Sequence, residues 1–376
     1  MCSSMIQPAI QDLDCAVREA TLSDFPAISD VVRRNGLTPA SYEHFARLWN
    51  DNPFRSELTV PIGWVLENKA LEIVGTLSNI GRMYVYNGEP IRVASASAWA
   101  VDPPHRTSAV FLAKQFFSQK NVDLFLNTTA SEAAAEVFKA FRCSEIPDPS
   151  FTRVLYWITS YAGFAGSVLR KLDIPLLPGL RHAAATAFYC QDLIRSGRVR
   201  FRPMETLLLG GFDERFDALW EQLRRKRDRL LAVRTAEALA WQFRPALESG
   251  SAAIIALREG KSLSGYLILM RGDDERIGLR RFRVIDIQTI RDEPDVVLSL
   301  MHAALEHAER SGVDVVEAVG FHRSKRDLLE QMNPHHRTYS SCPYLYKVKA
   351  NCQPLQDALH NADVWDASQF DGDASF

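Results

Sequence analysis

A chain of 376 residues with 47% hydrophobic and 24% charged side chains is long enough for two globular domains and too apolar to be disordered. Its 44 basic and 46 acidic residues give a net charge of −2, which excludes a broad basic field for nucleic acid. Its six cysteines are scattered without Cys-x-x-Cys spacing, so we expect neither a disulfide framework nor a bound metal.

The N-terminus lacks the basic segment and long apolar run that direct secretion. The sequence also has no stretch of about 18 uncharged apolar residues that would span a membrane. We therefore expect a cytoplasmic protein without a transmembrane segment. The near-neutral charge further predicts that nucleic acid is not a partner.

The first part of the chain predicts a strand, two helices and then a meander of strands. Residues 1–15 form a lead-in to the first expected strand. Two helices should begin near Thr21 and Ser41, because both residue types cap helix N-termini. Three or four strands then lead to residue 101, and the pair Asn87-Gly88 predicts a tight hairpin within them.

The stretch from Ala94 to Phe141 predicts strand, turn, helix, strand and helix. The first strand ends at Val101 in a proline-rich turn, and Thr107 can cap the helix that follows. A strand that leads into a helix N-terminus points free N–H groups and the positive end of the helix dipole at one spot, which suits an anion such as a diphosphate. Arg106 adds a permanent positive charge to that spot. An ordinary crossover with a surface arginine is the alternative interpretation.

The turn has the pattern Val101-x-Pro103-x-x-Arg106. A helix, a strand that ends in Asn127 and a helix that carries Phe138 follow it. This arrangement resembles the acyl-CoA-binding core of GNAT N-acyltransferases. The resemblance implies an α/β fold of two GNAT-like units, each with a mixed, mostly antiparallel central sheet flanked by helices. It also implies acetyl-CoA or another acyl-CoA as the co-substrate.

By this resemblance, the turn holds the CoA diphosphate and the strand end contacts the pantetheine arm or the acceptor. The implied cofactor-binding residues are Ala100, Val101, Arg106, Thr107, Ser108, Ala109 and Val110. The implied catalytic positions are Asn127 and Phe138. The family turn usually continues Gly-x-Gly after the arginine, and its later aromatic is usually a tyrosine. Because Phe138 has no hydroxyl to protonate a leaving thiolate, the candidates for that role are Ser97, Ser95, Thr128 and a water molecule.

The second half of the chain repeats the first. Val122-Asp123 and Val313-Asp314 lie 191 residues apart, and a helix follows a proline at the same spacing in each half. At this offset, the equivalents of Arg106, Asn127 and Phe138 are Val297, Ala318 and Leu329. The second copy has therefore lost the charge and the amide, and we expect one CoA site, in the first half.

The repeat divides the chain into five parts. They are a lead-in (1–15), a GNAT-like acyl-CoA-binding domain (16–160), an apolar helical linker (161–197), a second, degenerate GNAT-like domain (198–350) and an acidic tail (351–376). The strand 151–158 should close the first unit. The tail should be loose by its acidity, although Trp365 and Phe370 favour its docking on the second unit.

Residues 160–190 are apolar but interrupted by basic residues and prolines. A helix pair packed between the two domains is one interpretation, and a hairpin that contacts a membrane surface is the other.

The sequence favours an acyl-CoA-dependent N-acyltransferase in which a small-molecule amine attacks the thioester directly. Acetyl is the acyl group that we expect. The alternatives are a catalytically degenerate GNAT that binds acyl-CoA or assists assembly, and a Fem-type aminoacyl transferase. Glu67 and Glu72 are candidate bases, with plain surface carboxylates as the competing interpretation. The acceptor, the acyl chain length and the oligomeric state stay open.

Overall fold

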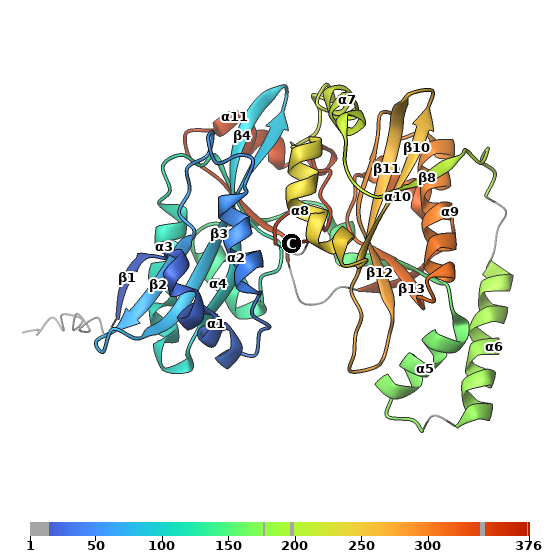
Figure 1. Cartoon of the computed structure of the whole chain (residues 1–376), viewed down its shortest axis with the longest axis horizontal. Coiled ribbons are helices and arrows are strands. Elements are labelled where there is room, and N and C mark those ends of the chain that lie inside the picture. Colours follow the sequence, from blue (N-terminus) through green and yellow to red (C-terminus); the bar gives the residue numbers. More distant parts are fainter. Residues whose placement is uncertain (1–14, 176, 196–198, 339–342, 374) are drawn as a thin grey trace, which may run out of the picture.

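The computed structural model describes residues 15–175, 177–195, 199–338, 343–373 and 375–376. Two β-sheets stand side by side, each flanked by helices (Figure 1). Buried apolar clusters lie within each unit, and a further cluster joins side chains of both sheets, among them Tyr84 of the first and Ile254 of the second. This architecture confirms the predicted α/β fold class with two helix-flanked sheets.

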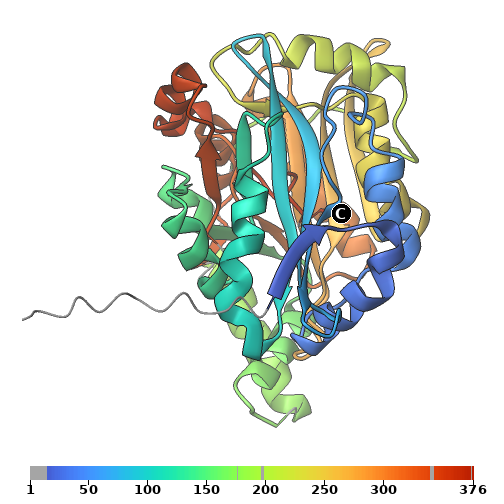
Figure 2. The ribbon, with the colours of Figure 1, turned by 90° about the vertical axis from the view of Figure 1, so that its left-hand side faces the viewer.

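The first sheet is mixed and mostly antiparallel, with a parallel step between its fourth and fifth strands. Its strands, in spatial order, are β1 (Cys15–Glu19), β2 (Gly63–Asn68), β3 (Ile73–Tyr86), β4 (Glu89–Val101), β5 (Leu124–Asn127), β15 (Leu345–Val348) and β6 (Ser144–Glu145), with β9 (Leu231–Ala232) paired to β3. The long β3–β4 hairpin stands out in Figure 2. It turns at Asn87 and Gly88, whose φ angles of 53° and 85° confirm the predicted tight turn.

The second sheet repeats this order. Its strands are β8 (Thr206–Leu209), β10 (Ala252–Glu259), β11 (Ser262–Arg271), β12 (Arg281–Thr289), β13 (Val315–Ala318), β7 (Arg153–Ile158) and β14 (His335–Thr338). Here too the step from the fourth to the fifth strand in spatial order is parallel.

Helices cover both sheets. They are α1 (Phe25–Arg34), α2 (Tyr42–Asn50), α3 (Ala109–Phe117), α4 (Glu132–Ala140), α5 (Tyr161–Lys171), α6 (Pro178–Arg195), α7 (Glu214–Leu223), α8 (Ala236–Glu248), α9 (Pro294–Arg310), α10 (Arg323–Glu330) and α11 (Gln353–Leu359), with 3-10 turns η1 (Leu22–Asp24), η2 (Pro103–Ser108), η3 (Pro149–Thr152) and η4 (Ala362–Val364). Ser41 and Ser131 cap α2 and α4 with their side chains. Among the described residues, no helix combines the length and the hydropathy needed to cross a bilayer.

The two units exchange one strand each. β7, expected to close the first unit, instead lies in the second sheet between β13 and β14. In return, β15 lies in the first sheet between β5 and β6. The prediction that residues 151–158 complete the first unit is therefore wrong, since an apolar strand pattern does not specify which sheet edge the strand joins. The remaining boundaries of the five parts stay a proposal.

A repeated ion pair marks the duplication. Asp123 accepts hydrogen bonds from the backbone and the guanidinium of Arg92, just before β5. Asp314 does the same for Arg280, just before β13. Both aspartates fasten the parallel step of their sheet, so the sequence offset of 191 residues corresponds to equivalent positions in the two units.

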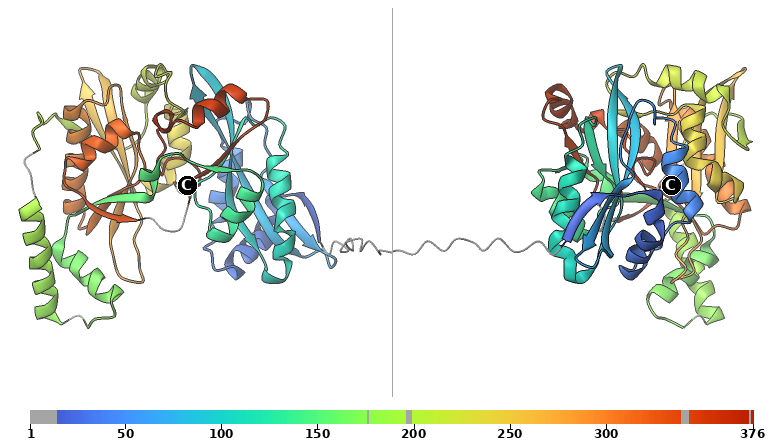
Figure 3. Two further views of the ribbon diagram at one scale, coloured as in Figure 1. Left: turned by 180° about the vertical axis from the view of Figure 1, so that it is seen from behind. Right: turned by 60° about the vertical axis from the view of Figure 1, so that its left-hand side comes forward.

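The C-terminal residues are packed between the units. Trp365 packs on Tyr344 and Tyr346, and Phe370 is fully buried. Seen from behind, the red C-terminal elements lie against the first unit (Figure 3). The expectation of a loose acidic tail is wrong for these described residues, because their aromatic side chains bury enough apolar surface to fix the segment.

Candidate functional site

The strands β4 and β5 separate after a short parallel pairing, and the candidate site lies where they part. Their register joins residues 93–95 to 124–126. Beyond Ser95, the described residues pair β4 with β3 only. A bulge at Ala98, whose φ is 45°, bends β4 at this point. We call residues 96–101 and 127–129 the first splay.

The predicted donor residues run from the first splay to the start of α3. Ala100 and Val101 are buried and pair with β3. Arg106 and Thr107 are exposed, as is Val110 on α3. Ser108 is half-buried and Ala109 buried. The exposed members therefore form a surface next to the end of β4.

The turn itself differs from expectation. Residues Pro103–Ser108 form the 3-10 helix η2, in which the N–H of His105 donates to the carbonyl oxygen of Asp102 at 2.9 Å. Thr107 lies inside η2, so its predicted role as a helix cap is wrong. Ser108 occupies the position before α3 without a side-chain capping bond. Because a 3-10 helix uses N–H groups internally, side chains of the turn would have to contribute more to anion binding than in an open glycine loop.

The three predicted catalytic positions have different surroundings. Phe138 is 1% exposed and packs on Trp99 and Phe117, with ring centroids 5.3 and 5.2 Å away. Asn127 is buried at the end of β5, where its Oδ1 accepts from the N–H of Thr129. Ser97 is half-buried in the first splay. The structure thus places Asn127 and Ser97 at the splay and Phe138 in the core beneath it.

Asp373, which no motif of the sequence singled out, lies beside the first splay. Its Oδ1 accepts a hydrogen bond from Thr129 Oγ1 at 2.7 Å, and Ser97 also hydrogen-bonds to its carboxylate. Burial raises the pKa of Asp373 above its usual value, although the bonds from Thr129 and Ser97 oppose this shift. A carboxylate with a raised pKa is a stronger proton acceptor, which suits it to general base chemistry.

A buried polar network holds this carboxylate in place. Arg82 donates to the carbonyl oxygens of Phe370 and Gly372, at 2.8 and 3.2 Å. The hydroxyl of Tyr84 donates to Asp371 at 2.5 Å. Gly372 has a φ of 72°, and a Cβ there would lie 2.1 Å from Thr128 Oγ1. The segment therefore reaches the first splay through a position that requires glycine.

Solved structures share this architecture at low sequence identity. A GCN5-related N-acetyltransferase from Anabaena variabilis ATCC 29413 aligns with a TM-score of 0.55 at 12% identity, over 91% of this chain and 74% of that chain. The Saccharomyces cerevisiae N-myristoyltransferase with bound myristoyl-CoA aligns at 0.54 and 12%, over 92% and 86%. A probable N-acyltransferase from Enterococcus faecalis V583 aligns at 0.56 and 9%, over 89% and 72%. No family model and no curated protein matches the sequence.

The chain has the GNAT fold in two units. The GNAT resemblance read from the sequence is confirmed at the level of the fold.

The second GNAT unit has an equivalent splay, formed by residues 285–289 of β12 and residues 319–321 after β13. Here the C-terminal segment occupies the opening. The N–H of Phe321 donates to the carbonyl oxygen of Ala367 at 2.6 Å, and Ser368 Oγ donates to the carbonyl oxygen of Ile285 at 2.9 Å. One backbone bond and one side-chain bond therefore hold Ala367 and Ser368 at this place.

The start of α9 in the second GNAT unit carries a negative charge. Asp292 accepts from Arg229 at 2.7 Å and forms an ion pair with Lys226 at 3.6 Å. Burial would raise the pKa of Asp292, but the positive charges of Lys325, Lys226 and Arg229 outweigh it and hold that pKa well below its usual range. Val297, the equivalent of Arg106, is fully buried. The position of Arg106 is thus taken here by a buried valine, and the nearby cations are paired with Asp292.

Two earlier candidates lie outside the first splay. Glu67 pairs with Arg18 at 2.8 Å, and Glu72 accepts from the side chain of Asn68 near the β2–β3 turn. These contacts favour their interpretation as structural carboxylates. Within the described ranges, no group of three or more potential metal ligands comes together.

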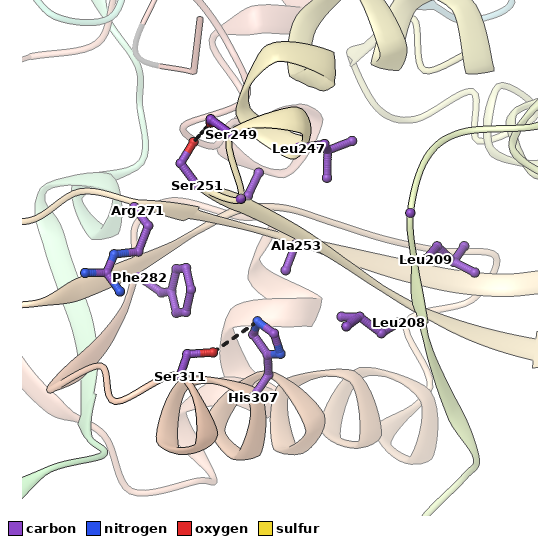
Figure 4. A pocket seen from close by; sticks show the side chains of 13 residues that line it. Leu208, Leu209, Leu247, Ser249, Ser251, Ala253, Arg271, Phe282, His307 and Ser311 are labelled. Carbon is purple, nitrogen blue, oxygen red and sulfur yellow. Dashed lines mark hydrogen bonds between the residues drawn. The ribbon is translucent and has the colours of Figure 1, made fainter.

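A surface cavity of about 560 Å³ lies elsewhere, on the second GNAT unit (Figure 4). Phe282 and His307 line it, together with Arg271, whose guanidinium pairs with Asp273. His307 contacts Ser311 at 3.5 Å across the edge of the cavity. These residues belong to β11, β12 and α9, and none of them lines either splay.

Proposed function

We propose that this chain is an acyl-CoA-dependent N-acyltransferase with one reaction site, at the first splay. The observation that carries the proposal is the position of Asp373. A carboxylate with a raised pKa is held beside two hydroxyls where β4 and β5 part. In the second unit, the equivalent opening is filled by the chain itself.

The donor in this proposal is acetyl-CoA or a longer acyl-CoA. The N-myristoyltransferase that shares the fold carries myristoyl-CoA. In this proposal the exposed Arg106 binds the diphosphate of CoA, and the hydroxyls of Thr107 and Ser108 donate further hydrogen bonds to it. Ala100, Val101, Ala109 and Val110 would border the pantetheine arm and the diphosphate through their backbone and apolar surface.

The chemistry requires one proton acceptor and one site for the thioester. The amine nitrogen attacks the thioester carbonyl carbon while Asp373 takes the amine proton. The C–N bond forms, the C–S bond breaks, and the CoA thiolate leaves and takes up a proton. Asn127 would orient the acceptor or the pantetheine amide at the end of β5. Ser97 would hold the carboxylate of Asp373 and supply a hydroxyl near the leaving sulfur.

The acceptor is a small-molecule amine in this proposal, and the protein acts in the cytoplasm. The net charge of −2 offers no broad positive field for RNA. This argues against the Fem-type alternative.

One observation favours a second candidate, an acyl-CoA-binding protein without turnover. Phe138 lies where the family usually has a tyrosine, and it is packed in the core without a hydroxyl. The thiolate would then have to leave without a tyrosine donor.

Calorimetric titration with acetyl-CoA and with a long-chain acyl-CoA tests the donor site. Arg106→Ala should weaken binding about tenfold or more, because a charge-assisted contact to phosphate is lost. Arg258→Ala, an exposed arginine of β10 in the second unit, is the matched control and should bind normally. Absence of binding to either thioester contradicts the proposal, and binding without acyl transfer to any amine supports the second candidate.

A further inference from the structure

The helical hairpin α5–α6 projects from the outer end of the second unit, far from the first (Figure 1). Its packing partners lie in the second unit, where Phe164 contacts Tyr156 of β7 and Ser167 donates to the carbonyl oxygen of Gly278. The interpretation of this segment as a helix pair between two domains is therefore wrong. The hairpin presents its far end to the solvent.

The far end of the hairpin is apolar and fully exposed. Every described side chain from residue 170 to residue 183 is exposed, including four aliphatic ones at the turn. Leu172 and Leu177 are each 61% exposed, and Ile174 and Leu180 are 37% and 41% exposed. We call the described residues 170–175 and 177–183 the hairpin tip. Four aliphatic side chains gathered at one projecting tip are an unusual arrangement for a free surface.

Basic residues surround this apolar tip. In the sequence, Arg170 and Lys171 lie at its start, and Arg181 and His182 lie at its end. Asp173 is the one acidic residue of the tip sequence. An apolar centre inside a cationic rim is complementary to an anionic lipid surface, where aliphatic side chains enter the headgroup region and basic ones contact phosphates.

The position of the tip is fixed by the contacts behind it. Arg181 donates to the carbonyl oxygen of Ala162 at 2.9 Å, which ties the start of α6 to α5. Arg170 donates to the carbonyl oxygen of Ile277 at 3.0 Å, which ties the end of α5 to the second unit. Farther along, the hydroxyl of Tyr161 donates to Asp192 at 3.0 Å. The exposed leucines therefore belong to an ordered element with a set direction.

We propose that the hairpin tip docks the protein reversibly on an anionic membrane surface. The tip is too short to cross a bilayer, so the binding is peripheral. This inference does not depend on the proposed acyl transfer.

Co-sedimentation with lipid vesicles tests the proposal. The full chain should sediment with vesicles of phosphatidylcholine and phosphatidylglycerol in equal parts, and much less with pure phosphatidylcholine. Leu172→Asp combined with Leu177→Asp should weaken binding about tenfold or more, because two apolar anchors are lost and negative charge is added. Lys171→Gln should weaken it about fivefold.

The control is Leu71→Asp, which changes an exposed leucine, 79% exposed, in the β2–β3 turn of the first unit. It should sediment like the wild type. Circular dichroism and thermal melting of the double variant should match the wild type, since both leucines are exposed. Equal sedimentation of the double variant and the control overturns the proposal. So does a wild-type dimer in sedimentation velocity that the double variant abolishes, because a second copy would then cover the tip.

Discussion

The two GNAT units share a strand order but differ in what occupies the opening after their parallel strand pair. In the second unit, Ala367 and Ser368 lie in the opening, held by one backbone and one side-chain hydrogen bond. In the first unit, the same segment contributes a side-chain carboxylate, Asp373, next to Ser97. The comparison shows how a duplicated fold can use one copy as a support. The second copy binds the segment, and the segment reaches the first copy.

The charged residues before α3 and before α9 also differ between the two units. The first unit exposes Arg106 before α3, and the second holds Asp292 before α9. The first position offers an exposed positive charge to an anion, whereas the cations at the second position are already paired with Asp292. The following variants test how far this division extends.

The largest expected effect is on turnover. Asp373→Asn should lower the rate of acyl transfer about 10²- to 10⁴-fold, because the amide cannot accept the amine proton. Binding of acyl-CoA should persist. Asp357→Asn, an exposed aspartate of α11, is the matched control and should leave both quantities unchanged. Full activity of Asp373→Asn in a thiol-release assay would remove this carboxylate from the mechanism.

The pH profile sharpens the same test. Since only the ionised carboxylate accepts a proton, kcat/KM should fall as the pH drops through the raised pKa of Asp373. A carboxyl whose folded pKa is raised contributes stability at acidic pH, and that contribution is lost as the pH rises through this pKa. Asp373→Asn should therefore abolish the acid limb of the profile without lowering stability at neutral pH.

The next effect is on stability. Asp366 forms a buried ion pair with Lys325 at 2.5 Å, with both side chains almost fully buried. Asp366→Ala should reduce the free energy of unfolding by about 3–5 kcal/mol, because it leaves the Lys325 ammonium buried without its partner. Asp363→Ala removes an exposed carboxylate that lies 3.7 Å from Arg323, and it should change little in the same chemical denaturation. Equal costs would mean that residues 366–368 are not anchored by this pair.

Alanine substitutions at two glycines distinguish the cost of backbone strain from the cost of a steric clash beside the first splay. Gly372 and Gly250 have φ angles of 72° and 70°, but a Cβ at Gly250 would meet no atom within 4 Å. Gly250→Ala should cost ~1 kcal/mol from its φ alone. Gly372→Ala should cost ~3 kcal/mol and also reduce activity, because the segment must move away from Thr128. Similar thermal shifts for both variants would contradict the packing described for Gly372.

The smallest expected effect is the difference in stability that the two repeated ion pairs contribute. Asp314 is 1% exposed and Asp123 is 8% exposed, while their arginine partners are both partly solvated. Asp314→Ala should cost about 2 kcal/mol, and Asp123→Ala about 1 kcal/mol, since burial strengthens charge-assisted hydrogen bonds. Denaturant titration of both variants measures the difference. A larger cost at Asp123 would reverse the order that burial predicts.

The local features of the first unit were readable from the sequence. The caps at Ser41 and Ser131, the turn at Asn87-Gly88 and the strand that ends at Asn127 all depend on neighbouring residues. Aromatic residues in the acidic tail, such as Phe370, indicated that this segment packs against the rest of the protein. Its destination could not be predicted, because no local pattern links Asp373 to Thr129 across the chain.

By itself, the sequence determined the GNAT layout, its duplication and the unequal fate of the two copies, because periodicity, capping and the offset of 191 residues are local or self-similar properties. The tertiary structure alone decided the exchange of β7 with β15 and the placement of Asp373 at the first splay. Both depend on which distant surfaces bury each other, and that choice is made by long-range packing and hydrogen-bond satisfaction in the complete fold.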